Sequence, residues 1–337
     1  MKKRKILPMT AAVLLALGSV RALAAGEMLV PGGQTVGIEL RCDGVMVSGL
    51  AEISTEEGGV CPAEEAGVRA GDRIIELNGQ SVHTAEEFVA RTEALDGGAV
   101  TLRAVREGRE LELTVEPREN REGRRQLGLW LRDSIRGIGT VTFYDPATGA
   151  YGALGHGVSL PESRELLPAG GGTITAARVV DVVPGKQGEP GELCGMPEPG
   201  LILGTVEQNT PRGIFGTMTG MAADRDALPV AADAEIRPGK ASILTTVDDG
   251  GPREYQVEIL RLETSETGGR QFTLRVTDPE LLAVTGGIVQ GMSGSPVLQN
   301  GRLVGAVTHV LVQDPGKGYG VTMENMLSAA RTENAAA

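Results

Sequence analysis

Short stretches of alternating hydrophobic and polar residues cover most of the chain, and turns containing Gly or Pro separate them. Alternation with a period of two predicts strands with one buried face. Helical periodicity is limited to short segments, one starting at Thr84 and one over 323–331. The pattern therefore predicts a mainly β chain, with strands in stretches such as 35–40, 99–115, 139–144 and 255–260.

The first 24 residues have a different pattern. Basic residues at positions 2–5 precede the apolar run 6–20, and Ala22-Leu23-Ala24 follows Arg21. This order of positive charge, apolar run and small residues is typical of an export signal. We expect residues 1–24 to be a signal peptide or an uncleaved signal anchor, so that the rest of the chain acts outside the cytoplasm.

The region 31–117 contains a specific motif. The string AGVRAGDRIIELNGQSV starts at Ala66, Asn78-Gly79 predicts a tight turn, and Thr84 with Glu87 forms a capping box at a helix start. The string resembles the PDZ domain family, whose members bind an extended peptide at a sheet edge and capture its carboxylate with backbone N–H groups. A tether that folds but binds nothing is the alternative. The corresponding peptide-binding loop is Gly33, Gln34, Thr35, Val36, Gly37 and Ile38.

The remaining chain divides by composition. Residues 118–134 combine basic and acidic side chains around Gly123, which is typical of an exposed linker. Many short strands follow over 135–331, as in β-barrels and sandwiches. The end of the chain, 332–337, is expected to be a disordered tail.

A candidate nucleophile lies near the C-terminal end, in Gly291-Met292-Ser293-Gly294-Ser295-Pro296. The glycines allow a tight turn in which the N–H groups of Gly291 and Ser293 form an oxyanion hole, and Ser293 is the nucleophile. Ser295 is expected to be structural. The string resembles the nucleophile loop of chymotrypsin-like peptidases. That resemblance implies a double β-barrel whose substrate pairs with the strand Thr308, His309 and Val310.

A serine nucleophile needs a base, and the chain has three histidines. His156 stands between two glycines in a loop after a predicted strand, which gives an imidazole access to a cleft, so we expect it to be the general base. His309 is expected to form the cleft wall, and His83 to lie in a solvated loop. Several aspartates between His156 and Ser293 could orient the base, and spacing does not choose among them.

Four longer strings narrow the resemblance. GALGHGV at 152–158, TDPELL at 277–282, TGGIVQGMSGSPVLQNGRLVGAVTHVLVQDP at 285–315 and GYGVTMENML at 318–327 resemble the stage IV sporulation protein B family of serine peptidases. The family pattern implies His156 as base, Ser293 as nucleophile and Asp278 as orienting acid.

The resemblance also implies a biological role. Such a peptidase leaves the forespore for the space between the two sporulation membranes and cleaves itself near its N-terminus. It then cleaves a membrane-bound regulator, so that an intramembrane protease activates a late sigma factor. Two alternatives stay open: a general extracytoplasmic quality-control protease with a PDZ domain, and a non-catalytic peptide-binding adaptor.

Composition excludes several other functions. A net charge of −12 argues against nucleic-acid binding, and three cysteines without a C-x-x-C pair argue against an ordinary zinc site. We expect no cofactor and no metal. The expected partners are a peptide or protein substrate, including the chain itself, with membrane association through the N-terminal segment. Cys42 and Cys61 could form a disulfide, provided that their geometry permits it.

Overall fold

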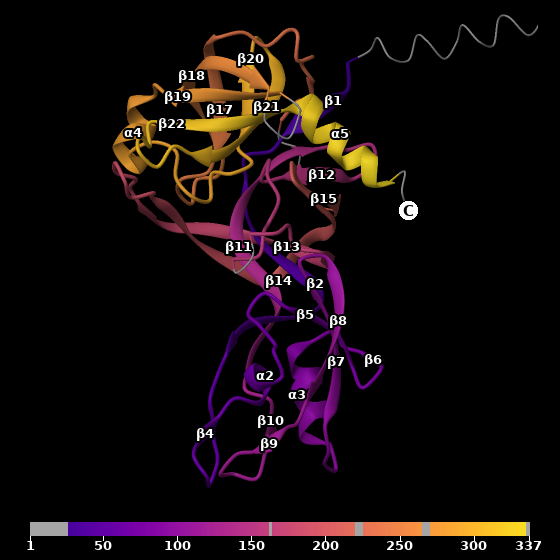
Figure 1. The fold of residues 1–337 in the computed structure, drawn as a ribbon. Coiled ribbons are helices and arrows are strands. Elements are labelled where there is room, and N and C mark those ends of the chain that lie inside the picture. Colours follow the sequence, from indigo (N-terminus) through magenta and orange to yellow (C-terminus); the bar gives the residue numbers. More distant parts are fainter. Residues whose placement is uncertain (1–25, 162–163, 220–224, 265–269, 335–337) are drawn as a thin grey trace, which may run out of the picture.

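The computed structural model describes residues 26–161, 164–219, 225–264 and 270–334, which form two β-barrels and a smaller PDZ unit (Figure 1). The expected export signal lies outside the described residues. So do the last three residues of the expected tail, whereas the preceding three belong to a C-terminal helix.

The first barrel is a ring of strands in which each pairs antiparallel with the next, and the pairing of β11 with β2 closes the ring. Its core is built from inward-facing residues such as Val36, Leu40, Val141, Ile174 and Ile214. A short strand β1 (Met28–Pro31) and β16 (Leu228–Pro229) extend it. The ring strands are β2 (Thr35–Leu50), β11 (Leu129–Tyr144), β12 (Ala150–Ala153), β13 (Ala169–Val183), β14 (Glu192–Thr210) and β15 (Gly213–Met218).

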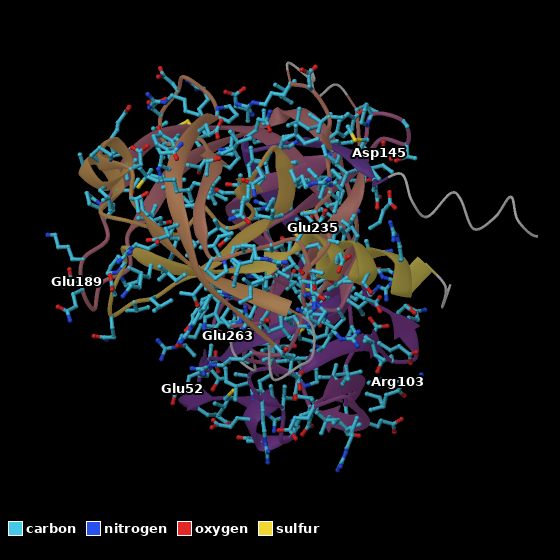
Figure 2. All side chains as sticks on the ribbon, turned by 90° about the horizontal axis from the view of Figure 1, so that it is seen from above. Glu52, Arg103, Asp145, Glu189, Glu235 and Glu263 are labelled. Carbon is cyan, nitrogen blue, oxygen red and sulfur yellow. The ribbon has the colours of Figure 1, made fainter. Side chains whose placement is uncertain are left out.

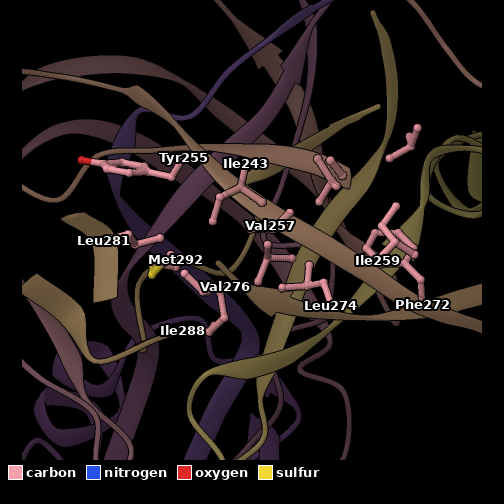
Figure 3. Packing of buried hydrophobic residues seen from close by; sticks show 14 of the residues in the cluster. Ile243, Tyr255, Val257, Ile259, Phe272, Leu274, Val276, Leu281, Ile288 and Met292 are labelled. Carbon is pink, nitrogen blue, oxygen red and sulfur yellow. The ribbon is translucent and has the colours of Figure 1, made fainter. Parts of the chain in front are cut away.

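The second barrel is also closed, and its apolar core is seen from close by in Figure 3. Phe272, Ile259 and Leu274 are fully buried in it. Two helices accompany it, α4 (Pro279–Thr285) and α5 (Met323–Asn334), and α5 contributes Met323 and Met326 to a cluster shared with the first barrel. The barrel strands are β17 (Gly239–Thr245), β18 (Arg253–Thr264), β19 (Arg270–Val276), β20 (Pro296–Gln299), β21 (Arg302–Val310) and β22 (Lys317–Thr322).

The PDZ unit occupies the lower part of Figure 1 and has its own core. Asp72, which has no exposed surface, is held by two hydrogen bonds from Arg106 of 2.6 and 2.7 Å. Its helices are α2 (Pro62–Glu65) and α3 (Ala85–Glu93), and its main strands are β5 (Arg73–Leu77), β7 (Val100–Arg106) and β8 (Arg109–Val115). Short strands are β3 (Ile53–Ser54), β4 (Gly59–Val60), β6 (Gln80–Ser81), β9 (Arg118–Glu119) and β10 (Arg125–Gln126).

Two long strands belong to both units. The first part of β2 and the last part of β11 lie in the first barrel. Their other ends, residues 45–50 of β2 and residues 129–132 of β11, complete the PDZ sheet. The PDZ unit is therefore inserted into the first barrel. This corrects the expected boundaries at 31 and 134: residues 28–31 and 35–42 are barrel strands, and 118–134 contain the β9–β10 hairpin and the start of β11. Alternation predicted strands here but not their partners.

Cys42 and Cys61 are both buried, in the cores of the first barrel and of the PDZ unit respectively, and the possible disulfide between them is not formed. Charged side chains such as Glu52, Glu189 and Glu263 project from the ribbon in Figure 2, as the acidic composition leads one to expect. Within the described ranges, no helix has the length and apolar character needed to cross a membrane.

Candidate active site

Ser293 lies in a tight turn that the first barrel holds in place. Gly291 and Gly294 have φ angles of +92° and +98°, which favour glycine, and a Cβ on Gly294 would lie 2.0 Å from the carbonyl oxygen of Thr140. Thr140 donates its backbone N–H to the Ser293 carbonyl at 2.9 Å, and its hydroxyl to the Gly291 carbonyl at 2.8 Å. Thr142 donates to the Gly294 carbonyl, also at 2.8 Å. Strand β11 therefore fixes the nucleophile turn.

Two backbone donors in this turn are free. Among the described residues, the N–H groups of Gly291 and Ser293 have no hydrogen-bond partner, although neighbouring N–H groups of the turn are bonded. Unpartnered N–H groups beside a nucleophile are what a developing oxyanion requires. The expected oxyanion-hole residues are therefore available for that role.

His156 lies in the loop that follows β12. Leu154 and Gly155 adopt φ angles of +68° and +69°, a backbone that is unfavourable for leucine. The Nδ1 atom of His156 lies 2.9 Å from the carbonyl oxygen of Gly157. Because a carbonyl only accepts, Nδ1 carries the hydrogen and Nε2 keeps the lone pair of a general base. Burial lowers the pKa of His156, and the bond to Gly157 opposes this shift.

His309 stacks against His156. Their ring centroids are 4.6 Å apart and their planes are tilted by 33°. His309 is exposed as a whole residue, yet partial burial of its ring, followed by the neighbouring His156, lowers the pKa of His309. The expected cleft wall is therefore in direct contact with the expected base.

One cleft brings these groups together. His156, Ser293 and the strand residues Thr308, His309 and Val310 line a cavity of about 460 Å³ between the two barrels. In this arrangement the Ser293 hydroxyl donates to the Thr308 carbonyl at 2.6 Å. Ser295 is fully buried and does not line this cleft. Within the described ranges, no group of His, Cys, Asp and Glu side chains could hold a metal ion.

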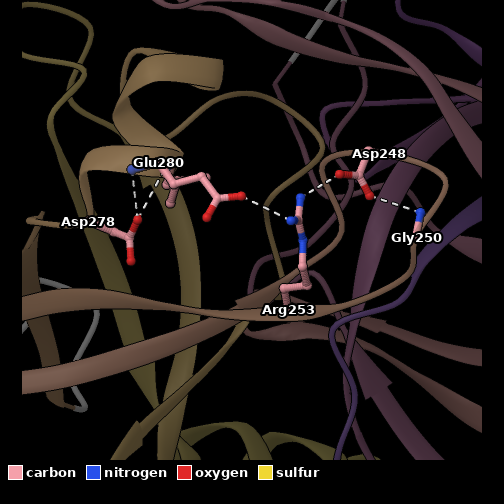
Figure 4. Close-up of polar contacts among 6 residues, drawn as sticks. Asp248, Gly250, Arg253, Asp278 and Glu280 are labelled. Carbon is pink, nitrogen blue, oxygen red and sulfur yellow. Dashed lines mark hydrogen bonds and ion pairs between the residues drawn. The ribbon is translucent and has the colours of Figure 1, made fainter.

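Asp278 occupies a different position from the one the family pattern implies. Its Oδ1 accepts the N–H groups of Glu280 and Leu281 at 3.0 and 3.2 Å, so that it caps α4, and its Oδ2 accepts the N–H of Gln256 at 3.1 Å. Figure 4 shows this cap beside the ion pair of Glu280 with Arg253. Among the described residues, no contact joins Asp278 to His156. The structure therefore gives Asp278 a capping position and does not bring it to the base.

The expected PDZ loop also lies elsewhere. Thr35, Val36, Gly37 and Ile38 form the start of β2 and pair with the part of β11 that belongs to the first barrel. Gly33 accepts a hydrogen bond from Thr246 of the second barrel, and Gln34 accepts the N–H of Val141. Residues 33–38 are thus barrel structure, and Ile38 lines the active-site cleft.

The PDZ unit has a groove at a different position from the predicted peptide-binding loop. This groove has a volume of about 280 Å³ and lies between α3, with Phe88 and Val89, and the segment 126–131. Gly128 has a φ of +77°, and within the described part of the chain the N–H groups of the buried Leu127 and Gly128 have no partner. The missed sequence signal was Leu127-Gly128-Leu129, a glycine between apolar residues, which lies after the PDZ motif instead of before it.

Comparison with known families agrees with this organisation. The profile of the SpoIVB peptidase S55 family matches residues 123–327, which is more than half of the chain, and a PDZ domain profile matches residues 60–106. The groove segment 126–131 lies outside the PDZ match and inside the peptidase match. A comparison with curated proteins found no match.

Several solved structures are similar to parts of the chain. The Rv3671c protease of M. tuberculosis in its active form is 14% identical, with a TM-score of 0.36, over 59% of this chain and 74% of that one. The HtrA-type protease AlgW with a tripeptide is 12% identical, with a TM-score of 0.37, over 58% and 56%. The PDZ domain of the SdrC-like protein from Listeria monocytogenes is 22% identical, with a TM-score of 0.22, over 26% and 87%. By its family match and its organisation, the chain belongs to the SpoIVB peptidase S55 family and is a PDZ-containing serine endopeptidase.

Proposed function

We propose that this protein is an exported, self-processing serine endopeptidase that acts as a signal during sporulation. Its target would be a membrane-bound regulator, whose cleavage allows an intramembrane protease to activate a late sigma factor. Membership of the SpoIVB peptidase family and the charged and apolar pattern of residues 1–24 support this proposal. On this reading the protein acts in the forespore intermembrane space and is at first attached to the membrane through its N-terminal segment.

The observation that carries the proposal is the cleft in which Ser293 and His156 lie beside two N–H groups that have no partner among the described residues. Ser293 Oγ would attack the scissile carbonyl while its proton passes to Nε2 of His156. The Oγ–C bond forms, and the negative charge that develops on the carbonyl oxygen is received by the N–H groups of Gly291 and Ser293. The proton on His156 then goes to the leaving amine, and water hydrolyses the acyl-enzyme.

The PDZ unit supplies a second peptide site. An extended peptide would add to the free edge of β11 at 129–132, where β2 is the only pairing strand among the described residues. Its terminal carboxylate would meet the N–H groups of Leu127 and Gly128, with the cation of Arg125 also lining the groove. The same strand β11 holds the nucleophile turn through Thr140. A peptide bound in the groove would therefore change the rate of proteolysis through strand β11.

A sporulating host that lacks its own member of this family provides the test. The wild-type chain should restore processing of the late sigma factor, and Ser293→Ala should not, although both proteins accumulate. Processing restored by Ser293→Ala would overturn a catalytic role and favour the adaptor. No restoration by the wild type, together with broad cleavage of unfolded proteins in vitro, would favour the quality-control protease.

A further inference from the structure

The loop that carries the general base is packed directly on the strand that carries His309. A Cβ on Gly155, whose φ is +69°, would lie 3.1 Å from Cγ2 of Thr308 and 3.2 Å from Cβ of Ala306, so a side chain there would be strained and would push against β21. The next residue, His156, stacks its ring on that of His309, with the centroids 4.6 Å apart. This distance lies within the range in which aromatic rings attract each other.

Asp278, the expected carboxylate support, does not reach the base, whose Nδ1 contacts the Gly157 carbonyl instead. In a serine peptidase the third member of the catalytic group holds the imidazole in its orientation and tautomer. Here the Gly157 carbonyl sets the tautomer through Nδ1, and Asp278 caps α4. A single hydrogen bond from Nδ1 leaves the ring free to turn about that bond, unless a second contact holds its face.

We propose that His309 is a positioning residue for His156: its neutral ring, stacked on the face of the base, holds that base toward Ser293 and shields it from water. His309 takes no proton in the reaction, because the Ser293 proton goes to Nε2 of His156. The role depends on the flat ring and not on its nitrogen atoms, since no hydrogen bond of the His309 ring is found among the described residues.

The charged groups that line the cleft are consistent with a neutral His309 ring. The charged or titratable side chains among its described lining residues are Arg136, His156 and His309. A second cation beside His156 would disfavour the imidazolium that forms during catalysis. The lowered pKa of His309, caused first by burial and then by His156, keeps it neutral when His156 takes up its proton.

The test compares His309→Ala, which removes the ring, with His309→Phe, which keeps a ring without nitrogen atoms. Val284→Ala is the matched control, because Val284 on α4 is 39% exposed and does not line this cleft. The probe is a fluorophosphonate, whose reaction with Ser293 gives a maximal rate and a half-saturating concentration. We expect His309→Ala to lower the maximal rate by roughly tenfold to a hundredfold at unchanged half-saturation, as loss of general-base positioning predicts. His309→Phe and Val284→Ala should stay within about threefold of wild type.

A second readout does not depend on activity. With three histidines in the chain, the ring signals of His156 are straightforward to assign by NMR in a Ser293→Ala background. Removing the stacked ring admits water, so the pKa of His156 should rise toward the ordinary histidine value in His309→Ala and stay unchanged in His309→Phe. Equal losses in the Ala and Phe variants, or an unshifted His156 in His309→Ala, would overturn the proposal.

Discussion

The hydroxyl of Ser293 donates a hydrogen bond to the carbonyl of Thr308, at 2.6 Å, on the strand expected to receive the substrate. In this arrangement the serine proton is directed at β21 and not at His156. A substrate that adds as a strand along β21 brings a backbone N–H toward the same carbonyl. Substrate binding and release of the serine hydroxyl toward the base are therefore expected to occur together.

Methylating the substrate nitrogen that faces Thr308 should slow cleavage. The methyl group removes one N–H donor, and loss of a hydrogen bond worth about 1 kcal/mol predicts a fall in kcat/KM of roughly fivefold to tenfold. The measurement uses a peptide that spans the self-cleavage site. A peptide methylated one residue away is the control, because alternate N–H groups of a strand point in opposite directions. Equal losses for both peptides would contradict pairing through Thr308.

Thr140→Val should make the backbone of the oxyanion hole less well ordered while leaving the fold unchanged. The substitution removes the hydroxyl that bonds the Gly291 carbonyl while keeping the shape of a fully buried side chain. We expect fluorophosphonate labelling of Ser293 to slow by about tenfold and the free energy of unfolding to fall by about 1 kcal/mol.

Thr92→Val is the matched control for that variant. Thr92 is also buried, and its hydroxyl donates to the Phe88 carbonyl at 2.9 Å in the PDZ helix α3. The loss of stability should be similar, whereas labelling should be unchanged. Slower labelling in both variants would mean that general destabilisation, and not the nucleophile turn, causes the effect.

The pH dependence of labelling should reflect the burial of His156. Burial lowers its pKa, so the base stays unprotonated below the ordinary histidine value of about 6.5. Labelling should therefore persist below pH 6.5 and fall only at more acidic pH. The measurement is the labelling rate between pH 4 and 8 in buffers of constant ionic strength, and a midpoint above 6.5 would contradict the buried base.

The free energy of unfolding should also depend on pH through the buried histidines. Below pH 6.5 the unfolded chain protonates histidines that the folded chain keeps neutral, so the free energy of unfolding falls as the pH drops through this range. His156 and His309 both have lowered pKa values and both contribute. Denaturant unfolding of His156→Gln should show a weaker pH dependence than wild type. An equal pH dependence in the two proteins would contradict this contribution of His156.

Peptide binding to the PDZ groove can be followed through Trp130, the single tryptophan, which lines the groove and is 65% exposed. An apolar peptide with a free terminal carboxylate should shift its emission to shorter wavelength, and the same peptide with an amidated end should bind at least tenfold more weakly. Val89→Glu, at the groove wall, should abolish the shift. Val180→Glu, at a similarly exposed valine on β13, should not. Equal binding of both peptides would exclude carboxylate capture.

Local motifs in the sequence were enough to predict that Ser293, His156 and Gly291 share one cleft. The glycines around Ser293 and His156 set the backbone within a few residues, so these side chains can be located without knowing the rest of the fold. Alternation predicted barrels or sandwiches, and the resemblance of the nucleophile string to chymotrypsin-like peptidases implied the double barrel. Family resemblance then supplied what the local pattern could not.

The positions of Asp278 and of the PDZ groove differ from the prediction, because they depend on long-range strand pairing or on competing local hydrogen bonds. Asp278 precedes Pro279 and a short helix, a sequence typical of an N-cap, and the cap uses its carboxylate. The PDZ groove is completed by Leu127-Gly128-Leu129 because β2 and β11 each pass through two units, and alternation alone does not say which strands pair. The stacking of His309 on His156 likewise follows only from the packing of a loop on β21.

The most direct test of the central claim, that Ser293 and His156 form a working peptidase site, is the intact mass of wild type, Ser293→Ala and His156→Gln during incubation, with fluorophosphonate labelling in parallel. We predict that the wild type shortens near its N-terminus and takes up one label. Both variants should stay full-length, and Ser293→Ala should take up none. Shortening of Ser293→Ala at the same rate as wild type, or a label on another residue, would contradict the assignment of the nucleophile.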